Sequence, residues 1–277
     1  MNPGFHELSW TAYRAFDAMN PSLLKVVANQ SPRHALYAKN NPKDPTDDMV
    51  MGTLAHMLIF EPGRFAETVA RFDGDGSKLT KAWREFRDAA EAGGKIPLHP
   101  TDEDEVQAWA DAVAAHEKCA ALIGLKGTTE LTVVWNDPTT GVVCKSRIDR
   151  LIEGETPIVL EFKTAADGSP AALQRVATRH GWDIAAAMRI DAIKQLTGKR
   201  ADYWFIVVEK SAPYVVTPYR CGADLEELGR VKYTKALTDW RACLQSGVYR
   251  GYSVGGLELN APLWELRAYE VEVGNEQ

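Results

Sequence analysis

The sequence is poor in cysteine, and its four cysteines stand far apart: Cys119, Cys144, Cys221 and Cys243. None of them forms a Cys-x-x-Cys pair. Structural zinc sites and iron–sulfur clusters need closely spaced thiolate ligands, so this spacing argues against both. We therefore expect reduced, partly buried thiols.

The chain also lacks long apolar runs and an excess of positive charge. No window approaches about 18 uninterrupted apolar residues, which argues against a membrane span. The first residues contain no basic stretch followed by an apolar run, so we expect a cytoplasmic protein without a secretion signal. The net charge of −6 argues against nucleic-acid binding by bulk charge alone, but it is compatible with a local basic channel around an acidic metal site.

The first part of the chain is predicted to be helical, and the middle part to form strands. Helical spacing and capping residues predict helices over 22–30, 33–40, 49 to about 62, 81–92 and 104–123. From Thr128, alternating apolar segments predict strands over 129–135, 142–152 and 157–163, separated by the turns NDPTTG and EGET. These three strands should pair as antiparallel neighbours.

A helical crossover is expected next. Ser169-Pro170 begins a helix, and a longer one follows with Asp183 as N-cap and Gly198 as C-terminal stop. The strands 201–210 and 214–221 and a last helix over 224–246 complete the order. Because such crossovers are right-handed, the strands 157–163 and 201–210 should be parallel. We expect one α/β domain over 1–277: a helical elaboration (1–127), a mixed central sheet flanked by helices (128–222), and a final helix and tail (223–277).

Charged side chains stand at the centre of the hairpin RIDRLIEGETPIVLEFKT, residues 147–164. Side chains alternate along a strand, so one face after the turn is apolar and carries Ile158, Leu160 and Phe162. The other face carries Val159, Glu161 and Lys163. Before the turn, alternation groups Lys145, Arg147 and Asp149 opposite Cys144, Ile148 and Ile152. Folding the hairpin should therefore bring Asp149 beside Glu161.

Two neighbouring carboxylates repel each other unless one stays protonated or a cation lies between them. Oxygen ligands from Asp and Glu suit Mg²⁺, with Mn²⁺ as a substitute, better than zinc. Lys163 beside such a site would orient or deprotonate a water and stabilise charge on a phosphate. Charged strand residues more often form a solvated face, and E-x-K alone is common; the upstream Asp149 and the following helix and strand favour the metal site. On this basis, Glu161→Ala should lose metal binding and stay folded, because the repulsion is relieved.

The hairpin resembles the signature of the PD-(D/E)XK nuclease superfamily, with Asp149 as the first acidic residue and EFK as the (D/E)-x-K triplet. Longer blocks resemble the exonuclease VIII (RecE-type) family of phage and prophage recombination nucleases: MGTLAHMLIFEP, TELTVVWNDPTTGVVCKSRIDRLI, TAADGSPAALQRVATRHGWDIAAAMRIDA and CLQSGVYRGYS. The resemblance extends over most of residues 10–265.

This resemblance implies a metal-dependent 5′-to-3′ exonuclease on linear double-stranded DNA, which leaves 3′ single-stranded tails for a partner annealing protein. It also implies Mg²⁺, a ring-shaped homo-oligomer around the duplex, and a phage- or prophage-encoded protein in a bacterial cytoplasm. The matching residues would be the metal ligands His56, Asp149, Glu161 and the Phe162 carbonyl. They would also include the catalytic Lys163 and a supporting acidic residue, Glu130.

One departure from the family concerns the helix after the lysine. Many relatives carry a Gln and a Tyr four residues apart there, where this chain has Ala185 and Arg189. Arg189 could replace them with a phosphate contact, since guanidinium is a delocalised cation. A nuclease that acts on any sequence grips phosphates rather than bases. The candidate contacts, each of which could equally be a solvated surface charge, are Lys145, Arg147, Arg150, Arg175, Arg179 and Arg189.

Two alternatives stay open. One is another end-processing nuclease of the superfamily, Cas4-like or RecB-like, although the cysteine spacing argues against the forms with an iron–sulfur cluster. The other is a non-catalytic DNA-binding module of the same fold. The paired acidic residues Asp149 and Glu161 with Lys163 speak against it, because a module without catalysis has no physical reason to keep two close carboxylates.

Overall fold

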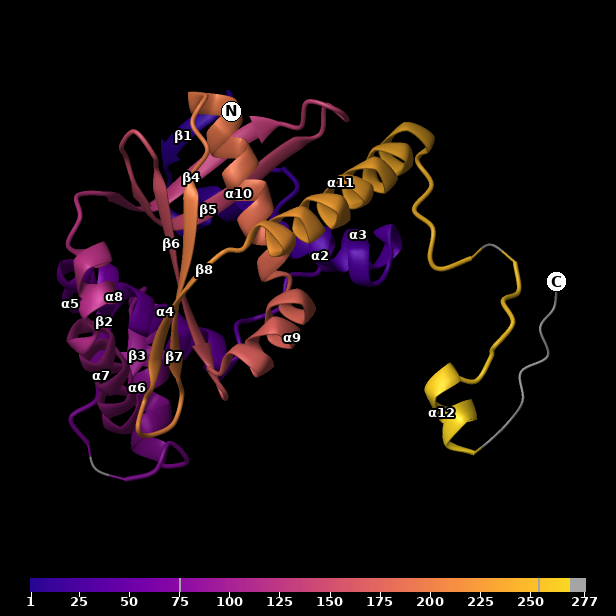
Figure 1. The fold of residues 1–277 in the computed structure, drawn as a ribbon. Coiled ribbons are helices and arrows are strands. Elements are labelled where there is room, and N and C mark those ends of the chain that lie inside the picture. Colours follow the sequence, from indigo (N-terminus) through magenta and orange to yellow (C-terminus); the bar gives the residue numbers. More distant parts are fainter. Residues whose placement is uncertain (75, 254, 270–277) are drawn as a thin grey trace.

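A computed structural model describes residues 1–74, 76–253 and 255–269, and it confirms the predicted α/β class (Figure 1). Six strands form one mixed sheet in the order β1-β4-β5-β6-β7-β8. Their bounds are β1 Gly4–Glu7, β4 Thr128–Asn136, β5 Val143–Ile152, β6 Ile158–Ala165, β7 Asp202–Glu209 and β8 Val216–Arg220. All neighbours are antiparallel except β6 and β7, which are parallel.

The predicted helical crossover joins the two parallel strands. It consists of α9 (Pro170–His180) and α10 (Trp182–Thr197). The antiparallel order of β4, β5 and β6 and the pairing of β7 with β8 are confirmed as well. Sequence patterns missed β1, which adds an edge strand to β4, because four residues near the N-terminus carry too little alternation to predict a strand.

Helices cover both faces of the sheet. On one face α10 packs with α2 (Pro21–Asn29), α3 (Pro32–Asn40) and α11 (Ala223–Ser246). On the other lie α4 (Asp47–Phe60), α7 (Pro100–Ala115) and α8 (Glu117–Ile123) (Figure 1). Leu160 and Phe162 of β6 face the α4–α7 layer and Val159 faces the α10 layer. Both faces of β6 are therefore buried, so Glu161 lies within the fold.

Shorter elements complete the chain. They are α1 (Trp10–Ala15), α5 (Pro62–Thr68), α6 (Lys81–Ala92), α12 (Leu263–Ala268) and a small parallel pair of β2 (Val69–Arg71) with β3 (Ile96–Leu98). The segment with α12 stands away from the sheet and the other helices in Figure 1. No helix among the described residues is long and apolar enough to cross a membrane. All four cysteines are buried free thiols, as predicted.

Helix ends follow capping chemistry, with two corrections. Ser31 and Ser169 cap helices that begin with proline, and Gly198 ends α10 with φ of 74°. Asp183 is not an N-cap: the helix begins at Trp182 with Gly181 as its N-cap, and Asp183 is fully buried against Lys232 at 2.6 Å. The predicted helix 104–123 is two helices, because His116 is extended and caps the second one.

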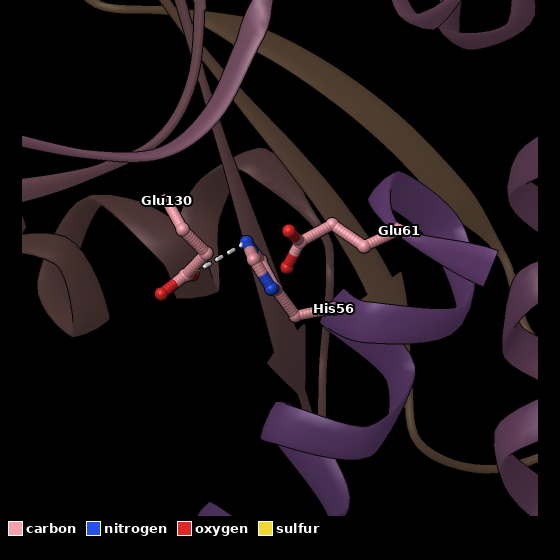
Figure 2. Close-up of side chains that lie close together, drawn as sticks. All are labelled: His56, Glu61 and Glu130. Carbon is pink, nitrogen blue, oxygen red and sulfur yellow. Dashed lines mark ion pairs between the residues drawn. The ribbon is translucent and has the colours of Figure 1, made fainter. Parts of the chain in front are cut away.

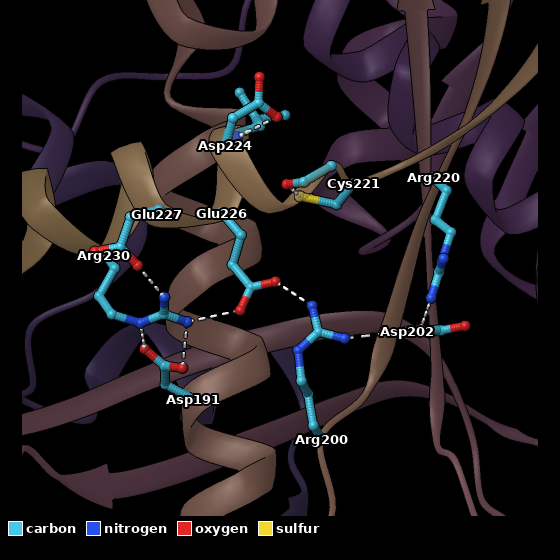
Figure 3. Close-up of polar contacts among 11 residues, drawn as sticks. Asp191, Arg200, Asp202, Arg220, Cys221, Asp224, Glu226, Glu227 and Arg230 are labelled. Atoms are coloured by element: carbon cyan, nitrogen blue, oxygen red, sulfur yellow. Dashed lines mark hydrogen bonds and ion pairs between the residues drawn. The ribbon is translucent and has the colours of Figure 1, made fainter.

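Helices α10 and α11 approach each other closely at a glycine. A Cβ on Gly229 of α11 would lie 2.0 Å from the Asp183 carbonyl oxygen of α10. Nearby, the Arg230 guanidinium binds Asp191 of α10 at 2.8 and 2.9 Å and Glu226 at 2.7 Å (Figure 3). The glycine permits the backbone contact, and the ion pairs hold the two helices in register.

Two helical glycines should therefore respond in opposite directions to alanine. Gly229→Ala is expected to lower the free energy of unfolding by about 1–3 kcal/mol or more, because an added methyl group forces α10 and α11 apart. Gly52→Ala in α4 meets nothing within 4 Å and is expected to raise it by roughly 0.5–1 kcal/mol. Urea denaturation of both variants measures this; stability changes of the same sign would contradict the packing described.

Candidate active site

The ladder between β4 and β5 is interrupted at one point. Leu131 pairs with Ile148, but the neighbouring Glu130 and Asp149 form no ladder pair. Glu130 has a φ of 52°, in the left-handed region that non-glycine residues rarely adopt. Such backbone outliers concentrate at functional sites, and here the distortion turns two acidic residues out of regular pairing.

The interruption also changes which face of β5 each side chain occupies. Ile148 and Leu151 pack in the same core cluster although they are three residues apart, and Ile152 packs in the other. The prediction that Ile152 shares a face with Ile148 is therefore wrong. Strict alternation predicts a regular strand, and this strand is irregular at residues 149–150.

Asp149 lies where β5 and β6 separate. The ladder between these strands runs from Ile152–Ile158 only to Arg150–Leu160. Beyond it, the Asp149 carboxylate accepts a hydrogen bond from the backbone N–H of Phe162 at 3.0 Å. The side chain thus reaches the E-x-K segment, next to Glu161. A ligand role for the Phe162 carbonyl stays a prediction.

His56 enters this site from α4. Its Nε2 atom lies 3.5 Å from a Glu130 oxygen and 3.7 Å from an Asp149 oxygen. The residue is 9% exposed, and Nε2 has no hydrogen-bond partner among the residues that the structure describes. The structure therefore brings together three residues that are far apart in the sequence, His56, Glu130 and Asp149, as the resemblance implies.

Glu61 is a fourth member that the sequence analysis missed. His56, Glu61 and Glu130 can place ligand atoms within 4.8 Å of one another, and the His56 ring lies between the two carboxylates in Figure 2. Glu61 follows α4, and its carboxylate accepts hydrogen bonds from Thr129 at 3.1 Å and Arg64 at 2.9 Å. A helical pattern places residues 56 and 61 on different faces. The sequence signal for Glu61 is its position in the FEP segment, at the end of α4 and directly before Pro62.

The residues at this point fit a divalent cation. Burial raises the pKa of Glu130, and the Asp149 charge raises it further against the lowering effect of His56 and Arg147. A cation would relieve this crowding and would also supply a partner for His56 Nε2. One imidazole nitrogen and several carboxylate oxygens form a donor set that Mg²⁺ and Mn²⁺ accept. The geometry thus supports a divalent-metal site around His56, Glu61 and Glu130, with the Asp149 carboxylate 3.7 Å from His56.

Glu161 is bound differently, by protein cations. One carboxylate oxygen lies 2.7 Å from the Lys163 ammonium and the other 2.7 Å from the Arg189 guanidinium. The second oxygen also accepts a hydrogen bond from the Tyr203 hydroxyl. Glu161 is only 4% exposed. The expected crowding between Asp149 and Glu161 is thus offset within the chain itself.

The ion pairs of Glu161 predict a pH effect on stability. Burial alone would raise the pKa of Glu161, but the Arg189 and Lys163 charges outweigh burial and lower it below its ordinary value of 4.5. The folded state therefore gains stability above the unfolded pKa and loses it as the pH falls through the folded pKa. We expect the wild type to be more stable than Glu161→Gln at pH 6, with the difference shrinking below pH 4.5. Thermal unfolding across this range tests the prediction; a constant difference would contradict it.

Three of the predicted DNA contacts are corrected by the structure. Lys145 is 3% exposed, and its ammonium donates to the carbonyls of Tyr13 and Phe16. Arg147 is 8% exposed and binds Glu130 at 3.1 Å. Arg189, also 8% exposed, binds Glu161. Each of these cations binds an internal partner. The N-terminal segment and α10 cover strands that the hairpin pattern predicted to face DNA.

The remaining candidates are closer to the surface. Arg150 is half-buried and donates to the Leu125 carbonyl at 2.7 Å. Arg175 and Arg179 of α9 are exposed. Burial and the charges of Lys25, Arg179 and Lys163 together lower the pKa of His180 at the end of α9. Positive charge therefore gathers between α9 and Lys163, beside the site.

Comparisons with known proteins place the chain in a family and show a similar fold. A family model described as "PDDEXK-like domain of unknown function (DUF3799)" matches residues 9–254. The fold is similar to the crystal structure of a "Putative exonuclease" from Eubacterium rectale, with a TM-score of 0.63 and 11% identity over 95% of this chain and 98% of that one. A second structure, SSO0001, aligns with a TM-score of 0.35 and 13% identity over 82% of this chain and 76% of its own. No curated protein matches. At these identities the first likeness shows the fold alone.

Proposed function

We propose that this chain, which belongs to the family of PDDEXK-like domains, is a metal-dependent 5′-to-3′ exonuclease of linear double-stranded DNA. Family and fold support a nuclease. The observation that carries the proposal is the convergence of His56, Glu130 and Asp149 beside the strand with Glu161 and Lys163. The exonuclease description of the Eubacterium rectale protein and the sequence resemblance favour attack at DNA ends.

Each residue of the site has a defined task in this proposal. His56, Glu61 and Glu130 would hold Mg²⁺ together with the neighbouring Asp149. When bound, the cation supplies positive charge to the phosphate and lowers the pKa of an attacking water. Lys163, whose side chain is 28% exposed, presents its ammonium to the phosphate and stabilises the charge that develops there. Glu161 fixes Lys163 at 2.7 Å.

The cationic surface of α9 is the proposed DNA-binding surface. Replacing Arg175 and Arg179 together by alanine should weaken duplex binding and reduce the slope of log affinity against log salt by about 2, because two phosphate contacts are lost. The matched control replaces Arg84 and Arg87, which lie on α6 in the opposite helical layer. Fluorescence anisotropy with a labelled duplex at several salt concentrations measures both. Equal slopes for the two double variants would rule out DNA binding by Arg175 and Arg179.

The products and partners belong to the same proposal. Attack from 5′ ends would leave 3′ single-stranded tails for a strand-annealing protein. A ring-shaped homo-oligomer would keep the enzyme on the duplex, and a phage or prophage origin would place it in a bacterial cytoplasm. These points rest on the sequence resemblance.

The test uses linear duplexes labelled at either the 5′ or the 3′ end, with Mg²⁺ or EDTA. We expect early release of the 5′ label, persistence of the 3′ label, and no cutting of covalently closed circles. Early release of the 3′ label would reverse the polarity. Cutting of closed circles would make the protein an endonuclease.

A second candidate is a DNA-binding module of the same fold that does not cleave. It is favoured by one observation: both Glu161 oxygens already bind protein cations. This candidate predicts duplex binding without metal-dependent release of either label.

A further inference from the structure

Arg189 is fixed on all sides of its guanidinium. Nη1 lies 2.7 Å from Glu161, Nε donates to the Ser146 hydroxyl at 2.9 Å, and Nη2 donates to the Arg147 carbonyl at 2.8 Å. The Tyr203 hydroxyl accepts a further hydrogen bond from Nη1. Because every nitrogen has a partner within the core, the side chain has no alternative position that keeps these bonds. Arg189 is therefore a permanent part of the site.

Glu161 is matched to this cation. One of its oxygens binds the half-buried Lys163, and the other binds Arg189 and Tyr203, which are buried. A metal ion on Glu161 would have to displace a buried guanidinium or lie against it, and like charges repel strongly at low dielectric. His56, Glu130 and Asp149 differ in this respect, since within the described part of the chain the buried His56 Nε2 has no partner.

We propose that Arg189 acts as a built-in cation that withholds Glu161 from metal, so that the site binds a single divalent ion through His56 and the carboxylates around it, Glu61, Glu130 and Asp149. This inference rests on the proposed metal-dependent function. It assigns Glu161 a positioning role: the carboxylate orients Lys163 and does not ligate the ion. An uncharged residue at position 189 would leave Glu161 open to a second ion, because the Glu161 oxygen that binds Arg189 would lose its cation. A guanidinium keeps its charge at any working pH.

Metal binding by the purified chain tests this directly, without reference to DNA. Calorimetric titration with Mn²⁺, checked by EPR of the free ion, should give one ion per chain. Glu161→Gln should keep that ion with an affinity changed by less than about tenfold, whereas Asp149→Asn should weaken it by more than about 100-fold. Two ions in the wild type, or equal losses in both variants, would overturn the proposal. The protein could still be a nuclease in either case. The single-ion proposal and the proposed nuclease function are therefore tested independently.

Substitutions at Arg189 predict a gain of metal binding, which a misfolded protein would not show. Arg189→Gln should gain a second, weaker Mn²⁺, because Glu161 is released, whereas Arg189→Lys should stay at one. If either single variant does not fold, the double variant Glu161→Gln/Arg189→Gln places two neutral amides in the buried pair and should still bind one ion. An Arg189→Gln protein that folds and binds only one ion, or a folded double variant that binds none, contradicts the proposal.

Discussion

Replacing Lys163 with methionine is expected to lower the rate of DNA hydrolysis by about 10²–10⁴-fold, the range for loss of a positioned proton-transfer or charge-stabilising group. The protein should stay folded, because Glu161 keeps its ion pair with Arg189 at 2.7 Å. Mn²⁺ binding should also persist, since Lys163 is not a ligand in this account. The measurement is the initial rate of nucleotide release from a linear duplex at saturating Mg²⁺.

A matched control distinguishes this role from a general effect of charge. Lys81 of α6 has an 85% exposed side chain in a surface pair with Glu85, so Lys81→Met removes the same charge far from the E-x-K strand. We expect its rate to remain within about twofold of the wild type, because exposed ion pairs contribute little. A Lys163→Met enzyme with nearly full activity would remove the lysine from the mechanism.

The second large effect concerns folding. Glu161→Ala is expected to lower the free energy of unfolding of the metal-free protein by about 3–5 kcal/mol, because it leaves buried Arg189 without its carboxylate. This reverses the expectation from the sequence, in which two close carboxylates repel. The structure places a guanidinium at 2.7 Å from Glu161. Removing the acid therefore leaves this buried charge unpaired and does not relieve a repulsion. Chemical denaturation in EDTA measures the change.

Glu153→Ala is the matched control for this variant. Glu153 is exposed in the turn after β5, and its loss should change stability by no more than about 0.5 kcal/mol. If Glu161→Ala were as stable as this control, or more stable than the wild type, the buried ion pair would not stabilise the fold as described.

The order of elements could be predicted from sequence because it depends on local signals. Alternation marks β4, β5 and β6, and capping serines before prolines mark the helix starts at Pro32 and Pro170. The helical crossover between β6 and β7 then makes these two strands parallel. The edge strand β1 and the division at His116 escaped prediction, because each depends on a pairing or a single backbone conformation that no periodicity encodes.

The residues of the candidate site could be predicted from the sequence, but their hydrogen-bond and ion-pair partners could not. Asp149, Glu161 and Lys163 follow from alternation in the hairpin, and His56 and Glu130 followed only from the resemblance. Lys145 was misassigned because its carbonyl partners lie about 130 residues away in the sequence, in the N-terminal segment. Arg189 was misassigned for a similar reason: its partner Glu161 lies on another element, and a sequence pattern does not tell a buried ion pair from a surface charge.

The most direct test of the central claim measures metal-dependent hydrolysis by the purified chain. A uniformly labelled linear duplex is incubated with Mg²⁺ or with EDTA, and acid-soluble nucleotides are counted for the wild type and for Asp149→Asn. We expect release by the wild type with Mg²⁺, and none with EDTA or with the variant. Equal release with EDTA, or undiminished release by Asp149→Asn, would contradict a metal-dependent nuclease site at His56, Glu130 and Asp149.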